Sequence, residues 1–307
     1  MTWLESSQLA GISAMKKDRI EHAFGGDWTT DKLNRLRKYL EAYTQALKNQ
    51  PFQLSYIDAF AGTGYRSARS KNTSPGLVLP ELADEEAESY LAGSARIALE
   101  IGRPFDRYVF VEKSPERAKQ LESLRQEFQS PSTSIDIVVG EANAYIKDLC
   151  GSTDWRGNRA VMFLDPYGMQ VNWDTVEAIA RTQAIDLWYL FPLAVNRLLI
   201  RGGKIDDSLR KRLDDVFGAT DWYEAFYSVD VQPSLYGDDE SVTKMATFQS
   251  IKHYMLNRLK GLFCGVANNP LELRNSRNTP LFLLCFAAGN PRGASIAVKI
   301  AQHILGK

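Results

Sequence analysis

The sequence predicts an α/β fold, with a Rossmann-like, doubly wound sheet that is mostly parallel, an antiparallel C-terminal strand and a helical insertion. Strand and helix signals alternate along residues 54–191. The strand segments are continuous apolar runs, of the kind that parallel sheets bury on both faces. A glycine-containing turn directly follows the first of these strands. With 307 residues, the chain is long enough to bury one elaborated core.

The first half of the chain supplies the alternating elements. Residues 30–48 carry apolar side chains at steps of three and four, which is typical of an amphipathic helix. An apolar strand over 54–57 follows, and residues 65–93 are polar enough to form an inserted loop. Further strands are expected over 108–112, 135–139, 160–165 and 185–191. Further helices are expected over 94–101, 114–128, 142–149 and 173–182.

The second half is expected to interrupt the sheet and then complete it. Apolar spacing predicts mostly helix in the insertion, then two strands over 262–267 and 280–287 and a closing helix over 290–305. The predicted organisation is an N-terminal helical segment over 1–50 that packs on the core, the core over 51–195, the helical insertion over 196–261, and C-terminal strands and helix over 262–307.

Charge and composition exclude several classes of protein. Lys plus Arg equals Asp plus Glu at 37 each, so the whole-molecule field does not attract duplex nucleic acid. No apolar run is long enough for a membrane span, and the N-terminus does not resemble a secretory signal. The three cysteines lack the spacing of a disulfide framework or a zinc site, so no metal is expected. We therefore expect a cytoplasmic location.

The stretch LSYIDAFAGTG at 54–64 is the most informative part of the chain. Its apolar strand ends in Asp58, and Gly62 and Gly64 follow within six residues. Because glycine has no Cβ, these residues let the backbone turn sharply and approach a ligand closely. The candidate ligand-binding residues of this turn are Asp58, Phe60, Ala61, Gly62, Thr63 and Gly64.

Three further strand ends carry polar residues. Glu112 ends the second strand, Gly140-Glu141-Ala142-Asn143 follows the third, and Asp165 ends the fourth. In a doubly wound sheet, ligands bind outside the carboxyl ends of the strands, near the topological switch point. We therefore expect these residues and Asp58 to meet in one crevice.

This combination of residues fits S-adenosylmethionine. Glu112 would accept hydrogen bonds from both ribose hydroxyls, and Asp58 would attract the ammonium group. Phe60 or Tyr167 would support the sulfonium through a cation–π contact. The adenine edge would be framed by Glu141, Ala142 and Asn143.

A dinucleotide cofactor is the alternative, because an acidic residue after the second strand also serves NAD. However, the turn reads A-G-T-G-Y-R rather than G-x-G-x-x-G, so the third glycine, which lets the helix pack closely, is absent. Asp58 would also place a negative charge near a pyrophosphate. The sequence therefore favours a methyl donor over NAD.

The hypothesis about chemistry depends on Asp165-Pro166-Tyr167-Gly168. Methylation of an exocyclic amine on a base needs an acceptor for one N–H hydrogen, so that the nitrogen lone pair points at the methyl group. Asp165 and the Pro166 carbonyl are the candidates for this role, and Tyr167 is the candidate for stacking on the base. The alternative is that D-P-Y-G is only a tight turn after a strand.

Because the net charge is zero, any site for a polyanion such as nucleic acid must be local. Arg66 and Arg69 follow the glycine turn and are the candidate substrate contacts. A second group of cations occupies a later helical segment, where a solvated helix face is the alternative explanation. Its members are Arg201, Lys204, Arg210, Lys211 and Arg212.

At these residues the chain resembles the three-Cys-motif partner proteins, a family with a Rossmann-like, methyltransferase-type core. The resemblance is carried by the helix over 28–43, YIDAFAGTGYR at 56–66, GSARIALEI at 93–101, PFDRYVFVEKSPERAKQL at 104–121, FLDPYG at 163–168 and PLFLLCFAAGNPRGASIAVKIAQHIL at 280–305. It implies a core that binds S-adenosylmethionine and a protein partner, encoded nearby, that bears the three-cysteine motif.

The chain also resembles, more widely, adenine-N6 and other amino-methyltransferases, whose motif reads Asp or Asn, Pro, Pro, aromatic. Here the second proline is missing, and Tyr167 comes one position early. The prediction is an S-adenosylmethionine-dependent methyltransferase acting on an exocyclic amine of a nucleic-acid base. A partner-dependent or non-catalytic component with the same core is the alternative.

Overall fold

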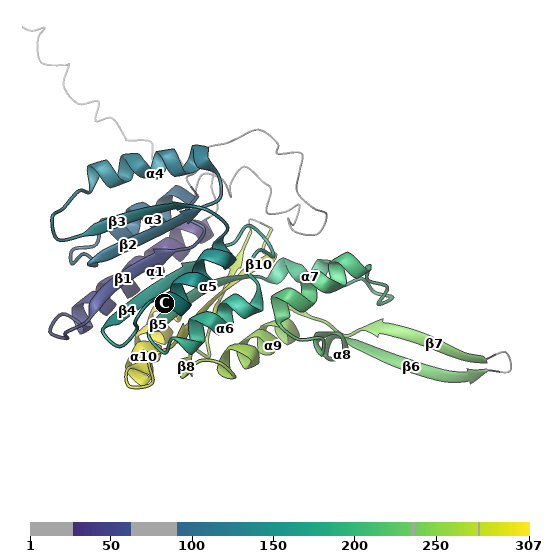
Figure 1. Cartoon of the computed structure of the whole chain (residues 1–307). Helices are drawn as coiled ribbons and strands as arrows, with labels where there is room; N and C mark the ends of the chain where they lie inside the picture. Colours follow the sequence, from purple (N-terminus) through teal and green to yellow (C-terminus); the bar gives the residue numbers. More distant parts are fainter. Residues whose placement is uncertain (1–26, 63–90, 235–236, 276) are drawn as a thin grey trace, which may run out of the picture.

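A computed structural model of the chain describes residues 27–62, 91–234, 237–275 and 277–307 (Figure 1). Thr63 and Gly64 of the predicted turn, the polar 65–90 segment and the candidate substrate contacts Arg66 and Arg69 lie outside these residues.

The central sheet has the predicted architecture. Five parallel strands occur in the spatial order β3-β2-β1-β4-β5, and their bounds are β1 (Gln53–Asp58), β2 (Arg107–Glu112), β3 (Ser134–Val139), β4 (Asn158–Leu164) and β5 (Ile185–Pro192). The long strand β10 (Pro280–Ala288) pairs antiparallel with β5, and the short strands β8 (Gly265–Val266) and β9 (Leu271–Arg274) pair antiparallel with β10. The mostly parallel sheet and its antiparallel C-terminal strand are therefore confirmed.

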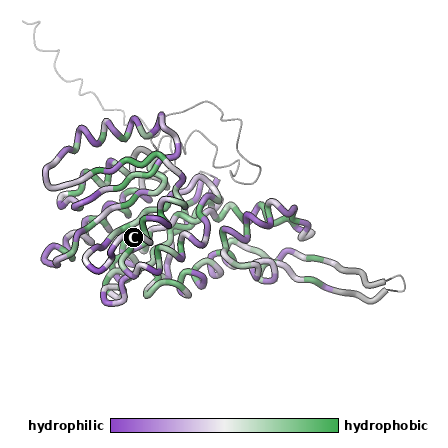
Figure 2. The backbone as a smooth tube through the Cα atoms, in the orientation of Figure 1, coloured by the Kyte–Doolittle hydropathy of each residue, from purple (hydrophilic) through white to green (hydrophobic). Residues whose placement is uncertain are grey.

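Continuous apolar sequence explains why the middle of the sheet is buried on both faces. Every residue of β5 and of β10 is buried, whereas most residues of the edge strand β3 are only half-buried. Apolar backbone segments run through the body of the molecule, where the sheet lies (Figure 2).

Helices cover both faces of the sheet, as a doubly wound fold requires. One face packs against α5 (Ala142–Ser152), α6 (Trp173–Arg181), α7 (Asp207–Phe217) and α9 (Phe248–Lys260). The other packs against α1 (Asp27–Ala46), α3 (Leu91–Leu99), α4 (Pro115–Glu127) and α10 (Ala294–Leu305). Side chains alternate along β1, so Ile57 faces the first helical layer and Tyr56 faces the second.

Side chains of α1 fix this helix to the second face. The Tyr39 hydroxyl donates a 2.7 Å hydrogen bond to the buried carboxyl of Asp186 on β5, and Arg35 donates to the Ile304 carbonyl of α10. Tyr39 also packs edge-on against Trp188, with ring centroids 5.2 Å apart. The N-terminal helix is thus part of the layer that covers the sheet.

The insertion after β5 differs from the prediction. It contains a short 3-10 helix (η2, Leu193–Arg197), α7, α8 (Trp222–Phe226) and α9, but residues 227–244 form an antiparallel ribbon of β6 (Tyr227–Ser234) and β7 (Gly237–Lys244) that projects from the body (Figure 1). The prediction of mostly helix was wrong there. The apolar residues Tyr227, Val229 and Val231 alternate with polar ones, which is the strand period of two.

The segment after α9 contains three strands where two were predicted. Strand β9 reads L-E-L-R, and its Leu273 is buried against β10. This segment is short and polar at alternate positions, so its sequence resembled a loop.

Candidate functional site

A notch opens at the carboxyl end of β1, because the chain continues further in the strand direction at β2 and β4, on either side, before it reaches the acid of each. Asp58, the last residue of β1, pairs in register with Phe110 on β2 and with Phe163 on β4. Glu112 and Asp165 each come two residues later, about 7 Å further along their strands. Strand order reverses between β1 and β4, so the notch lies at the topological switch point where such sheets bind ligands.

The three carboxylates point to the same face of the sheet. Side chains alternate along a strand, so Asp58, Glu112 and Asp165 share the face of Tyr56, Phe110 and Phe163, which is the α1 and α3 face. The sequence predicted that these acids would converge, and the register brings them to adjacent strand ends. We refer to Asp58, Glu112, Asp165 and the chain around them as the β1 crevice.

Asp58 is completely buried, with 0% of its surface exposed. Its Oδ1 accepts a 3.3 Å hydrogen bond from the Phe60 amide, while Oδ2 accepts none from a described residue. Burial, together with the charge of Asp165, raises the pKa of Asp58 to about 7, although hydrogen bonds from Ser94 and Phe60 and the charge of Lys32 act to lower it. A buried carboxylate oxygen without a donor is costly, so this atom fits a cationic ligand group.

Lys32 of α1 is a site residue that the sequence analysis missed. Its ammonium lies 2.5 Å from Oδ2 of Asp165, and the two residues are only 3% and 6% exposed. The same ammonium is 5.8 Å from the centre of the Phe163 ring. One cation therefore lies at the two buried acids, Asp58 and Asp165, and partly neutralises them.

The spacing of residues in α1 could have identified Lys32 as a buried lysine from the sequence alone. Lys32 stands four residues before Leu36 and seven before Tyr39, so helical spacing puts it on the buried stripe of α1. A lysine on an apolar stripe needs a buried partner. That partner is 133 residues away in the chain, and only the fold brings the two together.

Tyr56 adds a neutral donor to the β1 crevice. The side chain is completely buried on β1, two residues before Asp58. Burial raises the pKa of Tyr56 well above its usual value, and the charges of Asp58 and Asp165 raise it further. The hydroxyl thus stays protonated at any physiological pH.

Glu112 is 8% exposed at the end of β2. Its Oε1 accepts a 2.8 Å hydrogen bond from the amide of Ser114, the residue that caps α4. This contact orients the carboxylate, and among the described residues it is the only hydrogen bond to the Glu112 side chain. The predicted ribose contact therefore retains an acceptor oxygen.

The backbone after Asp58 crosses the floor of the notch. The Ala59 amide donates to the Phe163 carbonyl of β4, and the Ala61 amide then donates to the Val111 carbonyl of β2, at 3.2 and 3.0 Å. Gly62 closes a tight turn by donating to the Phe60 carbonyl at 2.8 Å. Phe60 is half-buried against the α5 and α6 layer, whereas Ala61 is fully buried.

The residues predicted at the adenine edge have structural roles here. Glu141 caps α5 by accepting from the Asn143 and Ala144 amides. Partial burial opposes its charge, but these hydrogen bonds and one from the Asn143 side chain outweigh it and lower the pKa of Glu141.

Asn143 joins α5 to the segment before α6. Its amide nitrogen donates to Glu141 and to the Gln170 carbonyl, and its oxygen accepts from the Asn172 amide and the Thr175 hydroxyl, all within 3.0 Å. The side chain thus uses its full hydrogen-bonding capacity inside the protein. Its contact with adenine, together with those of Glu141 and the buried Ala142, stays a prediction.

The Asp165-Pro166-Tyr167-Gly168 motif forms a tight turn. The Gly168 amide donates to the Pro166 carbonyl at 3.0 Å, and Gly168 has the left-handed φ of 88° that suits glycine. The Tyr167 amide donates to the side chain of Gln170 at 2.9 Å. The turn is therefore real, and it also holds the Asp165 carboxylate inside the β1 crevice, so the two interpretations of the motif are compatible.

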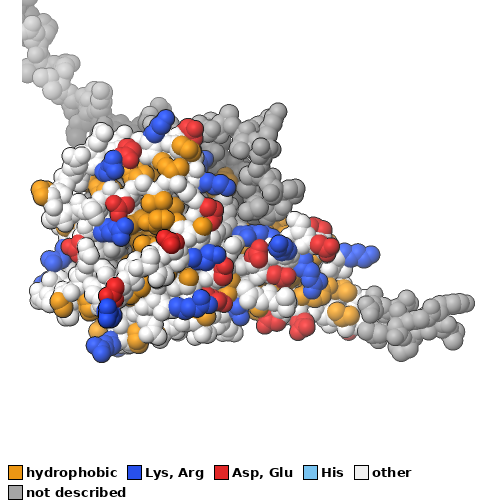
Figure 3. Space-filling model, in the orientation of Figure 1, with side chains coloured by type: hydrophobic (Ala, Val, Ile, Leu, Met, Phe, Trp, Pro, Cys, Tyr) orange, Lys and Arg blue, Asp and Glu red, His pale blue; other side chains and the backbone are white. Residues whose placement is uncertain are grey.

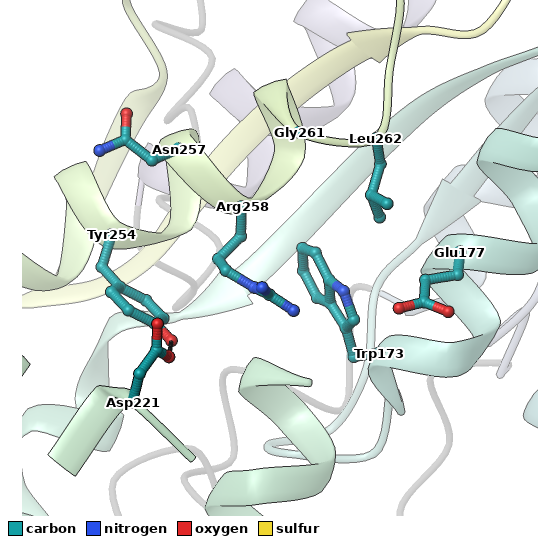
Figure 4. Close-up of a pocket in the computed structure, with 8 residues that line it drawn as sticks. All are labelled: Trp173, Glu177, Asp221, Tyr254, Asn257, Arg258, Gly261 and Leu262. Carbon is teal, nitrogen blue, oxygen red and sulfur yellow. Dashed lines mark hydrogen bonds between the residues drawn. The ribbon is translucent and has the colours of Figure 1, made fainter. Parts of the chain in front are cut away.

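A separate pocket of about 380 Å³ lies between α6 and α9 (Figure 4). Its cation, Arg258, lies over the Trp173 ring at 4.9 Å and donates to the carbonyls of Phe217 and Gly218. The Tyr254 hydroxyl donates to Asp221 on the opposite wall. Arg258, Tyr254 and Asp221 thus have partners within the protein, and the contact of Arg258 with Trp173 links α9 to α6. This pocket is therefore not the candidate site.

No family model matches the chain, and no curated protein does. Among solved structures, protein LPL1258 of the DUF519 family from Legionella pneumophila is 17% identical, with a TM-score of 0.38 over 78% of this chain and 94% of its own. A candidate methyltransferase from Thermobifida fusca is 11% identical, with a TM-score of 0.35 over 84% and 81%. A candidate methylase from Haemophilus influenzae is 13% identical, with a TM-score of 0.27 over 68% and 88%.

At these values the likenesses carry no argument about chemistry. The sheet of this chain departs from the dinucleotide-binding fold at one edge, because an antiparallel strand follows β5 where that fold has a sixth parallel strand.

Two properties of the described residues bear on other classes of protein. No helix among them has both the length and the apolar character that crossing a bilayer requires. No three His, Cys, Asp or Glu side chains gather among them as a set of metal ligands.

Proposed function

We propose that this protein is an S-adenosylmethionine-dependent methyltransferase that acts on an exocyclic amine of a nucleic-acid base. The observation that carries the proposal is the β1 crevice, in which Asp58, Asp165 and Lys32 are buried together at the switch point, with Glu112 at the next strand end. Such a concentration of buried charge is costly unless a ligand completes it.

The groups of the crevice match the parts of the donor. The orphaned Oδ2 of Asp58 suits the ammonium of the methionine part, and the nearby Lys32 suits its carboxylate. The remaining oxygen of Glu112, on the neighbouring strand, suits the ribose hydroxyls. The amino-acid part of the donor carries one positive and one negative charge, so its binding site needs both an acid and a cation. A pyrophosphate carries only negative charge and does not need the acid.

Asp165 would orient the acceptor. S-adenosylmethionine supplies an electrophilic methyl group, so the amine lone pair forms the new N–C bond while the C–S electron pair leaves with sulfur. Asp165 accepts one amine hydrogen and so aims that lone pair, and the proton is lost to water after transfer. The increase in rate comes from holding the amine nitrogen and the methyl group in line.

Lys32 forms an ion pair with Asp165 and so helps to hold its carboxylate in place for this task. It also competes for Oδ2, the oxygen that it contacts at 2.5 Å. Acceptor binding at Asp165 would therefore use Oδ1, or would follow a shift of the lysine toward the carboxylate of the donor.

The test is transfer of a labelled methyl group to nucleic acid. Wild type should label a single-stranded RNA or DNA pool, and Asp165→Asn should lose transfer while it still binds the demethylated product, S-adenosylhomocysteine. Binding without transfer in the wild type would reject catalysis by the chain alone, and absence of both would reject the proposal.

A partner-dependent component is the second candidate, and the Lys32–Asp165 pair favours it. The acceptor oxygen is occupied in the isolated chain, and the Pro166 carbonyl already accepts from Gly168. A protein partner bearing a three-cysteine motif, encoded nearby, would then activate the site. Copurification with that protein, and transfer only when both are present, would distinguish this candidate from the first.

A further inference from the structure

Two cations meet at the root of the β6–β7 ribbon. Arg201, in the turn after η2, and Lys244, the last residue of β7, line an open groove of about 660 Å³. The other lining residues are Gly202, Val242, Thr243 and Ala246. Among the described residues, no carboxylate forms an ion pair with either cation. We call this the ribbon groove.

The structure holds these like charges together. Lys244 donates to the Asn196 carbonyl at 2.5 Å, which directs its ammonium toward the segment that carries Arg201. Partial burial lowers the pKa of Lys244, and the positive charge of Arg201 lowers it further. Two cations that repel each other without a neutralising acid are unfavourable, unless an anion binds between them.

The two segments that line the ribbon groove lie in stretches without acids, although Asp206, Asp230 and Glu240 flank them. No Asp or Glu occurs over 187–205 or over 241–271. On the face drawn in Figure 3, cations and acids are intermixed. In a chain with 37 residues of each sign, this gap makes a local site of positive charge without a positive whole-molecule field.

The neighbouring cations divide into two groups. The Arg210 guanidinium lies 4.7 Å from the centre of the Tyr223 ring, and the Tyr223 hydroxyl donates to the Gly203 carbonyl, so Arg210 stands beside the turn that carries Arg201. Lys204, in the same turn, is exposed. Arg212, in contrast, turns inward and donates to the side chain of Asn172 at 2.7 Å.

The ribbon groove and the β1 crevice lie on the same edge of the sheet. β4 ends just before Asp165, and its parallel neighbour β5 ends at Pro192, after which η2 leads directly to the turn at Arg201. Ile200, Val229 and Met245 expose apolar surface on the segments around the groove. Cations beside exposed apolar side chains are what a nucleic-acid strand contacts with its phosphates and bases.

We propose that the ribbon groove binds the phosphodiester backbone of a single-stranded nucleic acid. A few converging cations suit a strand better than a duplex, and a base must leave its stack to be modified. The groove would hold the strand whose base enters the β1 crevice. This role rests on the proposed methyl transfer, whereas strand binding itself rests only on the groove.

The test is fluorescence anisotropy with a labelled 20-nucleotide strand, as RNA and as DNA, at low salt. The Arg201→Gln, Lys244→Gln double variant should bind about tenfold more weakly, and its salt slope should fall by about 1.4, or roughly 0.7 for each phosphate that the variant no longer neutralises. The matched control is Lys38→Gln with Lys299→Gln, two exposed lysines on α1 and α10, which should stay within about twofold of wild type.

Arg201→Glu alone guards against misfolding, because this side chain is exposed, and it should weaken binding at least as much as Arg201→Gln. Failure of wild type to bind either strand, or equal binding by the groove variants, would overturn the proposal. Equally tight binding of polyglutamate would show that the groove selects charge alone, which also overturns it. S-adenosylhomocysteine affinity should be unchanged in every groove variant, so failure of the donor site is measured separately.

Discussion

The β1 crevice and the ribbon groove differ in how far their charged side chains are buried and in the sign of the charge that predominates. In the crevice, Asp58, Asp165 and Lys32 are almost completely buried, and acids outnumber the cation. In the groove, Arg201 is exposed, Lys244 is partly buried, and no described acid forms an ion pair with either. A chain with no net charge can thus hold both a buried, mostly acidic site and an open, basic one.

Burial decides how strong each site is. Charges in a water-poor crevice interact strongly and resist screening, whereas charges in an open groove act over about one Debye length and weaken as salt rises. The two regions should therefore respond differently to substitution, to salt and to pH.

The largest effect should come from Lys32→Met. It removes the cation and leaves two buried carboxylates, Asp58 and Asp165, without compensation, so the free energy of unfolding should fall by about 3–5 kcal/mol in urea denaturation. Adding Asp165→Leu should restore most of the loss, because an apolar pair replaces the ion pair.

Lys38→Met is the matched control for this prediction, since Lys38 is exposed on the same helix, and it should cost less than about 0.5 kcal/mol. A decrease of under about 1 kcal/mol in Lys32→Met would mean that the lysine is not the buried partner of Asp165.

The second-largest effect should come from salt, which should weaken binding at the ribbon groove much more than binding at the β1 crevice. Between 50 and 200 mM salt, strand affinity should fall about twentyfold if three cations contact phosphates. S-adenosylhomocysteine affinity should change less than about twofold over the same range, because its charges would be buried. Titrations of both ligands in one salt series measure the difference, and parallel salt slopes would contradict it.

pH should have a smaller effect, which in the β1 crevice comes from Asp58. Burial raises the pKa of Asp58 to about 7, so the folded state holds a proton that the unfolded state loses near pH 4. Stability contributed by this proton is present at low pH and is lost as pH rises toward about 7. Asp58→Asn should therefore gain stability relative to wild type between pH 5 and 8.

The affinity for S-adenosylhomocysteine should rise with pH, whereas the stability that the Asp58 proton contributes falls. The ammonium of S-adenosylhomocysteine needs ionised Asp58, so its affinity for wild type should rise about tenfold from pH 6 to pH 8, while Asp58→Asn stays flat. Calorimetry across this range measures both proteins. A flat profile for wild type would show that Asp58 does not hold the ammonium.

Much of the fold and part of the crevice followed from local sequence. Buried parallel strands read as continuous apolar runs, and acids directly after such runs fall at one edge of the sheet, so Asp58, Glu112 and Asp165 could be placed without coordinates. The ribbon over 227–244 was missed because its strand alternation lies between helices and was interpreted with them.

What the sequence could not supply was long-range pairing. Lys32 and Asp165 meet only because α1 packs on the face of the sheet to which Asp165 points. Asn143 was predicted to contact a ligand, but three of its four side-chain hydrogen bonds join segments that are distant in the chain. Arg201 and Lys244 come together only through the ribbon that was missed.

The most direct test of the central claim is calorimetric titration of S-adenosylhomocysteine into wild type and into Glu112→Gln, a change that keeps the shape of the side chain and the fold. We expect micromolar binding by wild type and a ten- to hundredfold weaker affinity in the variant, since one charged hydrogen bond to the ribose is weakened. No heat from wild type at millimolar ligand, or equal affinity in both proteins, would contradict a donor site in the β1 crevice.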